Sequence, residues 1–223
     1  MSGLQQLATR ARQVTLDQPA TLGDGDCEAL RPGLIGQPVN TITSFAYVGA
    51  GVWLASRLGR LPSRQRPAAA AYAALTAVTG VGSIAYHGPQ FAGAQFLHDA
   101  PIVGAFALGA VVPLWRLARR GVPVPGWSTR LGAAMAATTV GSLAAYAAGG
   151  TDSPLCRPES LLQPHGLWHV GTAALIAMWG AALWAPRPAG AADVEGPDAE
   201  ESLAEHADDE PATETGASGA ADR

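Results

Sequence analysis

The chain carries five long apolar stretches that hold almost no charged residues. The hydrocarbon core of a bilayer is about 30 Å thick, and a helix of about 20 residues spans it. Inside that core a helix satisfies all of its own backbone hydrogen bonds. The stretches therefore predict an all-α, polytopic transmembrane helix bundle of about five spans, at residues 40–58, 67–86, 96–114, 131–148 and 162–184.

Charged residues are few and unevenly placed. Only 14% of the residues are charged, and eleven of the 18 acidic residues lie after residue 190. Residues 187–223 have almost no large apolar side chains, so we expect a disordered acidic cytoplasmic tail there. Residues 1–39 are expected to form an extracytoplasmic segment and residues 40–186 the bundle. The net charge of −4 comes from the tail, and no basic face indicates nucleic-acid binding.

The arginines predict an orientation. Loops rich in Lys and Arg stay on the cytoplasmic side of a membrane. Two predicted loops are rich in arginine, namely Arg57, Arg60, Arg64 and Arg66 in the first and Arg116, Arg119, Arg120 and Arg130 in the third. We therefore expect the N-terminus outside and the C-terminus in the cytoplasm. Abundant alanine and arginine without any lysine indicate a GC-rich, bacterial genome. The membrane is therefore expected to be a bacterial plasma membrane.

Five polar residues fall at the outer ends of these spans. Ser83 and His87 end the second span, Asp99 begins the third, and His165 and His169 begin the fifth. The segment HGLWH places its two histidines four residues apart, so that both side chains lie on one helix face. With His87 they predict a zinc site, because three protein ligands and an open position are typical of catalytic zinc.

Each of these residues also has a structural interpretation. A lone histidine at a membrane interface is commonly a hydrogen-bonded structural residue, and Ser83 can bond its own helix backbone. A carboxylate such as Asp99 within a span is functional by default, unless it lies in the wet interface. His98 points about 100° away from Asp99 on a helix, which favours a position at the interface or behind the ligands over a metal ligand.

The two cysteines, Cys27 and Cys156, both fall on the predicted outer side. Oxidising conditions there favour a disulfide between them. Two free thiols are the alternative. A disulfide would connect the N-terminal segment to the loop that leads into HGLWH, beside the predicted zinc site.

Several segments together resemble the alkaline ceramidase family: CEALRPGLIGQPVNTITSF, GVGSIAYHGPQ with LHDAP, and HGLWHV. This family belongs to a membrane hydrolase superfamily that also contains the progestin and adiponectin receptors. The resemblance covers about residues 24–186 and rests on the ordered set of SxxxH, Asp and HxxxH. It implies a shortened version of a seven-span fold, in which two spans before HGLWH are missing.

The resemblance implies a zinc-dependent hydrolase that cleaves the N-acyl amide bond of a ceramide-like membrane lipid at the outer face. His87, His165 and His169 would bind Zn²⁺. Asp99 and Ser83 would be catalytic, contacting the zinc-bound water or the substrate carbonyl. The resemblance also implies that the two cysteines are paired. A receptor or sensor of the same superfamily, with a structural or vestigial zinc site, is the alternative.

Members of the ceramidase family also hold a calcium ion near the N-terminal cysteine. Glu28 matches one of the expected ligands, and Asp24 and Asp26 are further candidates. The chain departs from the family at Gln37, where a second carboxylate is expected, and at Leu30, where a polar ligand is expected. The predicted calcium site therefore depends on the two aspartates.

Overall fold

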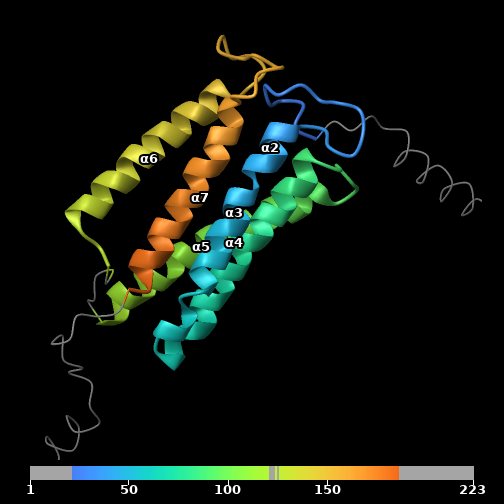
Figure 1. Ribbon diagram of the computed structural model, residues 1–223. Helices are drawn as coiled ribbons and strands as arrows, with labels where there is room; N and C mark the ends of the chain where they lie inside the picture. Colours follow the sequence, from blue (N-terminus) through green and yellow to red (C-terminus); the bar gives the residue numbers. More distant parts are fainter. Residues whose placement is uncertain (1–21, 121–123, 125, 186–223) are drawn as a thin grey trace, which may run out of the picture. The chain divides into compact units, whose positions relative to one another are not determined.

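The computed structural model describes residues 22–120, 124 and 126–185. Every regular element in these residues is helical, which confirms the predicted all-α class. Two short helices come first, α2 (Pro38–Thr43) and α3 (Phe45–Ala55), followed by two 3₁₀ turns, η1 (Leu58–Arg60) and η2 (Ser63–Gln65). The longer helices in Figure 1 are α4 (Arg66–His87), α5 (Ala94–Arg120), α6 (Thr129–Ala148) and α7 (Pro164–Leu183).

Four of the described helices are long and apolar enough to cross a membrane, and they indicate an integral membrane protein. These segments are Ser63–His87, Ala94–Ala118, Thr129–Ala148 and Pro164–Leu183. They correspond to the second to fifth predicted spans. The first predicted span, residues 40–58, is divided between α2 and α3. The start of the N-terminal segment, before residue 22, and the acidic tail lie outside the described residues.

Ser44 joins α2 to α3 and keeps helical dihedral angles, with φ −62° and ψ −23°. Its hydroxyl donates to the carbonyl of Asn40 at 2.6 Å, and the hydroxyl of Thr43 donates to the carbonyl of Val39 at 2.9 Å. Side chains that bond back to the preceding turn in this way disturb a helix. Two short helices, placed end to end in Figure 1, take the place of one long span.

Local signals explain where the helices begin. Pro38, Pro67 and Pro164 stand in the first turns of α2, α4 and α7. A proline costs nothing there, because the first N–H groups of a helix have no partner within it. α6 begins differently, since the hydroxyl of Ser128 accepts the N–H of Leu131 at 3.2 Å.

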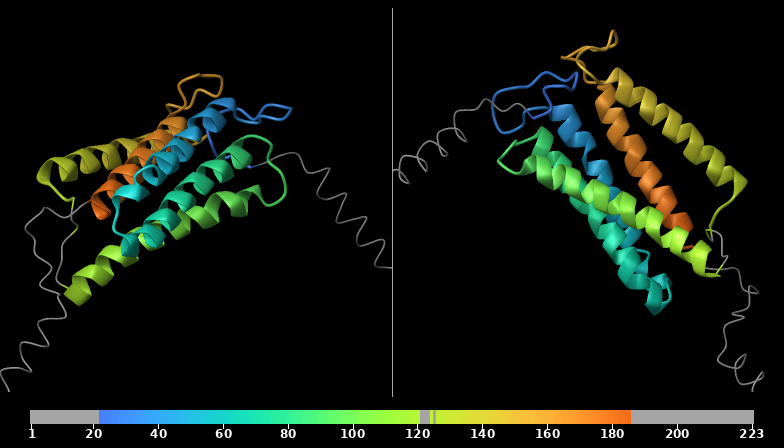
Figure 2. Two further views of the ribbon diagram at one scale, coloured as in Figure 1. Left: turned by 60° about the horizontal axis from the view of Figure 1, so that its bottom comes forward. Right: turned by 180° about the vertical axis from the view of Figure 1, so that it is seen from behind.

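α4 packs between α3 and α5, as the views in Figure 2 show. Glycines permit this close approach. A Cβ atom on Gly51 would lie 2.6 Å from the backbone nitrogen of Ala77 in α4, and one on Gly82 would lie 2.0 Å from the carbonyl oxygen of Leu97 in α5. Small residues at such contacts let helix backbones pack closely where lipid offers no hydrophobic driving force.

Apolar side chains of α3, α4 and α7 form the core. Tyr47, Tyr72 and Leu183 are buried there, and the hydroxyl of Tyr72 donates to the carbonyl of Ile176 at 3.2 Å. α6 packs mainly on α7, and most of its residues are exposed. An apolar helix with so little protein contact is suited to lie against lipid.

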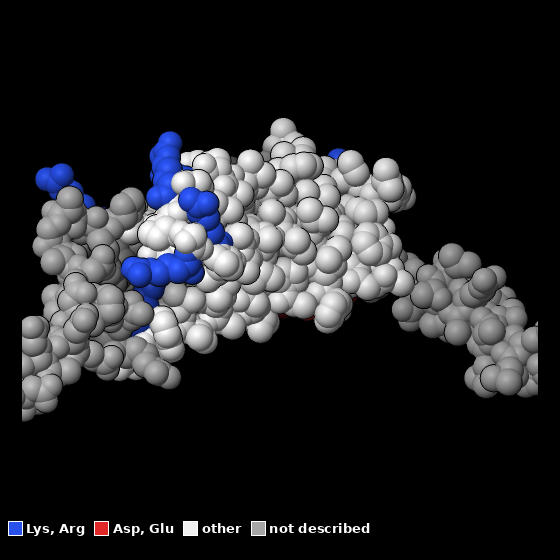
Figure 3. Space-filling model, turned by 90° about the horizontal axis from the view of Figure 1, so that it is seen from below, with Lys and Arg blue, Asp and Glu red and all other residues white. Residues whose placement is uncertain are grey.

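Arginines and histidines lie at opposite ends of the bundle. In Figure 3 arginine side chains gather at one end, where α3 ends, α4 begins, α5 ends and α6 begins. His87 ends α4, and His165 lies in the first turn of α7, so both belong to the other end. The histidines and the arginine-rich turns thus lie at opposite ends of the helices, and the membrane face of each end stays a prediction.

Gly82→Ala is expected to destabilise the bundle by about 1–3 kcal/mol, because its methyl group would meet the backbone of α5 in a closely packed contact. The midpoint of thermal unfolding in detergent measures the effect. Gly141→Ala in α6 is the matched control, since a Cβ atom there meets nothing within 4 Å and alanine favours a helix. Equal midpoints in the two variants would contradict the proposed packing.

Candidate metal centre

Three histidines from two helices meet at one end of the bundle. His87 is the last residue of α4, and His165 and His169 lie in the first two turns of α7. Their ring centroids are 5.3 Å apart for His87 and His165, 5.0 Å for His87 and His169, and 4.7 Å for His165 and His169. One candidate ligand atom from each lies within 4.8 Å of the others. Histidines placed in this way can hold a metal ion.

The Nε2 atoms of His87 and His169 are buried and have no hydrogen-bond partner among the described residues. Each of the two residues is only 1% exposed. A buried polar atom without a partner is costly, and most buried polar atoms in folded proteins have one. A metal ion between the rings would satisfy both nitrogens, so the side chains present here fit a metal ion.

The other ring nitrogens of these two histidines have polar partners. Nδ1 of His87 lies 2.6 Å from the amide oxygen of Gln37. Nδ1 of His169 lies 3.2 Å from the hydroxyl of Thr43 and 3.3 Å from that of Ser44. Partners of this kind fix the orientation and the tautomer of a metal-binding histidine. They leave Nε2 of both residues available to a metal ion.

The third histidine has a carboxylate as its partner. Oδ1 of Asp26 lies 3.1 Å from Nδ1 of His165, and the Asp26 side chain is 17% exposed. Burial, with the carboxylates of Asp24 and Glu28 as smaller causes, raises the pKa of Asp26 to about 7. A cation held by the histidines would favour the charged form of this carboxylate.

Ser83 belongs to the same buried group, one turn before His87. Its hydroxyl lies 2.8 Å from the hydroxyl of Ser44, which in turn lies 3.3 Å from Nδ1 of His169. The hydrogen bond of Ser83 thus runs to the residue between α2 and α3, and the hydroxyl of Ser44 connects Ser83 to His169.

Asp99 lies at the same end of the bundle, but its carboxylate is held outside the histidine cluster. Oδ1 of Asp99 lies 2.7 Å from Nδ1 of His98, and the Asp99 side chain is 56% exposed. The ring of His98 stacks on Tyr86, and its centroid is 6.3 Å from that of His87. The structure therefore brings together four of the five predicted site residues and pairs the fifth with its own neighbour.

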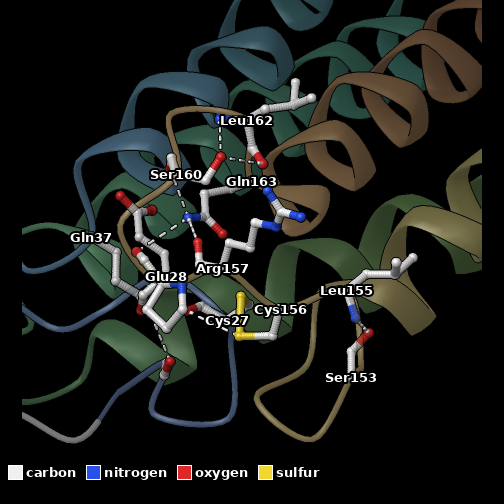
Figure 4. Close-up of a disulfide and its surroundings, with 12 residues drawn as sticks. Cys27, Glu28, Gln37, Ser153, Leu155, Cys156, Arg157, Ser160, Leu162 and Gln163 are labelled. Carbon is white, nitrogen blue, oxygen red and sulfur yellow. Dashed lines mark hydrogen bonds between the residues drawn. A yellow bond between two sulfur atoms is a disulfide. The ribbon is translucent and has the colours of Figure 1, made fainter.

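A disulfide joins Cys27 to Cys156, as predicted, and Figure 4 shows its surroundings. The backbones beside it are also paired. The N–H of Cys27 donates to the carbonyl of Gly149 at 2.6 Å, and the N–H of Thr151 donates to the carbonyl of Gly25 at 3.0 Å. The segment before α2 is therefore fastened to the loop before α7.

The three candidate calcium ligands have different surroundings in the structure. Both carboxylate oxygens of Glu28 accept backbone N–H groups at the start of α2, from Val39 at 2.7 Å and from Asn40 at 2.8 Å. Asp24 is exposed, and Asp26 faces the histidines. Glu28 thus contributes to the start of α2, and the calcium site stays a prediction.

Gln37 stands where a family carboxylate was expected, and its amide group has a different role. The amide nitrogen donates to the carbonyls of Gly23 and Glu28 at 2.7 Å and 2.9 Å. Carbonyl oxygens are typical calcium ligands, and here an N–H donor occupies them. The amide oxygen faces His87. Gln37 thus belongs to the surroundings of the histidines.

Four residues near the histidines were not predicted to contact them: Asp26, Gln37, Thr43 and Ser44. The last two are polar residues inside an apolar stretch, a signal that could have identified them. The contact between Gln37 and His87 joins positions 50 residues apart. No local sequence pattern indicates such a contact.

No family model, curated protein sequence or solved structure matches this chain. The geometry of the three histidines and of their hydrogen-bond partners is therefore what bears on function.

The purified protein is expected to hold about one divalent metal ion per chain. His87→Ala and His169→Ala are each expected to lose it, because each change removes a buried Nε2 atom that lacks a protein partner. Elemental analysis after gel filtration measures the metal content. His98→Ala is the control, since His98 bonds Asp99 outside the cluster. Retention of the metal in both cluster variants would show that these histidines do not bind it.

Proposed function

We propose that this chain is a zinc-dependent membrane amidohydrolase that cleaves the N-acyl bond of a ceramide-like lipid. The observation that carries the proposal is the group of three histidines, in which two buried Nε2 atoms lack a protein partner. Imidazole nitrogens suit Zn²⁺, and three protein ligands with an open position are typical of catalytic zinc. The resemblance to alkaline ceramidases supports the choice of substrate.

The reaction adds water across the amide bond and releases a fatty acid and an amine. Zn²⁺ held by His87, His165 and His169 would supply a nucleophile near neutral pH, since zinc lowers the pKa of a coordinated water. Ser83 would turn its hydroxyl from Ser44 to donate a hydrogen bond to the carbonyl oxygen as negative charge develops on it. Asp99 would accept the proton of the water and return it to the leaving amine.

An apolar cavity of about 420 Å³ supports a lipid substrate. It lies between α5, α6 and α7, and its lining includes Phe106, Leu143, Trp168 and Thr172. The last two lie one residue before and three residues after His169, so the cavity and a candidate metal ligand share α7. Apolar cavities with few polar groups are typical of sites for apolar ligands. We therefore assign the cavity to part of the acyl chain.

The site is proposed to face the outside of a bacterial plasma membrane. The histidines lie at the end of the bundle opposite the arginine-rich turns, and such turns stay on the cytoplasmic side. The disulfide at the histidine end supports the same orientation, because disulfides persist in oxidising compartments.

A receptor or sensor with a structural zinc site is a second candidate, and the position of Asp99 favours it. The carboxylate of Asp99 is exposed and bonded to His98. It would have to leave that partner to exchange a proton at the histidines. A sensor needs no such proton acceptor, so turnover distinguishes the two candidates.

Zinc-loaded protein in lipid vesicles is expected to release fatty acid from N-acyl lipids. Ser83→Ala is expected to lower kcat by about 10²–10³-fold, as the loss of an oxyanion donor does. Asp99→Asn is expected to abolish turnover while zinc is retained, because it removes the proton acceptor. Mass spectrometry of the released fatty acid measures turnover.

The control for both variants is Ser56→Ala, at the opposite end of the bundle. Zinc-loaded wild-type protein that releases no fatty acid from N-acyl lipids with several head groups would contradict the enzyme and favour the sensor.

Ala110→Trp tests the cavity. Ala110 and Ala107 are both exposed on α5, but only Ala110 lines the cavity. The ratio of kcat/KM for a long-chain substrate to that for a short-chain substrate is expected to fall about tenfold in Ala110→Trp. The indole ring would exclude part of the acyl chain from the cavity, and a tenfold loss corresponds to about two methylene groups that are no longer buried. Ala107→Trp is expected to leave this ratio unchanged. The same ratio in both variants would place the acyl chain elsewhere.

A further inference from the structure

One carboxylate faces histidines of both helices. Oδ1 of Asp26 lies 3.1 Å from Nδ1 of His165 in α7, and Oδ2 lies 3.6 Å from Nδ1 of His87 in α4. The opposite edge of the His87 ring carries the unpartnered Nε2 atom. Asp26 therefore lies on the side of this ring that faces away from the candidate metal position.

Backbone contacts hold Asp26 in place. Its N–H donates to the carbonyl of Gly23 at 3.0 Å, and the residue forms an isolated antiparallel bridge with Gly150. The next residue, Cys27, is in the disulfide. The loop on the other side of this bridge touches α7 directly, since a Cβ atom on Gly149 would lie 2.8 Å from the backbone nitrogen of His165.

We propose that Asp26 is the positioning residue of the metal centre, which holds the imidazoles of α4 and α7 in a common orientation through their Nδ1 atoms. The inference rests on the metal site of the proposed function. A carboxylate at Nδ1 fixes the ring, selects the tautomer that leaves the other nitrogen free, and raises its basicity. Removing a partner of this kind typically costs 10–100-fold in metal affinity.

The two histidines depend on Asp26 to different degrees. His87 has a second and closer acceptor, the amide oxygen of Gln37, at 2.6 Å. Asp26 lies closer to His165, at 3.1 Å, than to His87, at 3.6 Å. Gln37 is neutral, so the negative charge that increases the basicity of the ligands comes from Asp26. The variant Asp26→Asn keeps the size of the side chain and removes this charge.

Asp26→Asn is expected to bind Zn²⁺ about 10–100-fold more weakly than the wild type, measured by competition with a chromophoric chelator. The Co²⁺-loaded variant is expected to keep a visible absorption band as intense as that of a tetrahedral site, because the three ligands stay. The wavelength of this band is expected to differ from that of the wild type, because the orientation of the ligands changes. Asp24→Asn is the matched control. It makes the same chemical change two residues away, at an exposed side chain.

Folding is checked separately. Equal thermal midpoints of the metal-free wild type and metal-free Asp26→Asn, with the disulfide intact on a non-reducing gel, assign the loss of affinity to the metal centre. Wild-type affinity and an unchanged Co²⁺ band in Asp26→Asn would overturn the proposal. Complete loss of the metal, as in His87→Ala, would also overturn it, since Asp26 would then be a ligand.

These outcomes are separable from the fate of the proposed function. A wild type that binds Zn²⁺ but releases no fatty acid would remove the hydrolase and leave the role of Asp26 testable by affinity and by the Co²⁺ band. A wild type that binds no metal would overturn both.

Discussion

Polar groups buried at the histidine end need partners, and all but a few of them find these within the protein. An unsatisfied buried donor or acceptor costs about 1–3 kcal/mol. The segment before α2 supplies many of the partners: Glu28 caps α2, Gln37 bonds His87, and Asp26 faces His165. The residues that close this end of the bundle are therefore the same ones that orient its histidines.

Much of the fold could be predicted because length and hydropathy are local properties of the sequence. The four long helices match the predicted spans closely, except that α5 continues past residue 114 to Arg120. In this extension the side chain of Arg116 donates to the carbonyl of Leu183 at the end of α7, a contact that hydropathy does not reveal. The division at Ser44 was missed, because the stretch around it holds no proline or charged residue that would end a helix.

The meeting of the three histidines could be predicted from helical periodicity and the direction of the spans. The contacts around them could not. Asp99 was placed at the correct end of the bundle, but His98 beside it holds its carboxylate, and apolar periodicity does not reveal a side-chain rotamer. The expected calcium ligands were assigned by their position in a motif. Their partners in the structure come from distant segments, as with Glu28 and Asn40.

The disulfide has a consequence for biosynthesis. It joins positions 129 residues apart, and α2 to α6 all lie between them. During synthesis, Cys27 leaves the ribosome long before Cys156, and the two histidines of α7 follow only after that second cysteine. The N-terminal segment therefore has no covalent partner until almost the whole bundle has been made. A metal ion held by all three histidines would therefore be bound only at one of the last steps in the maturation of the protein.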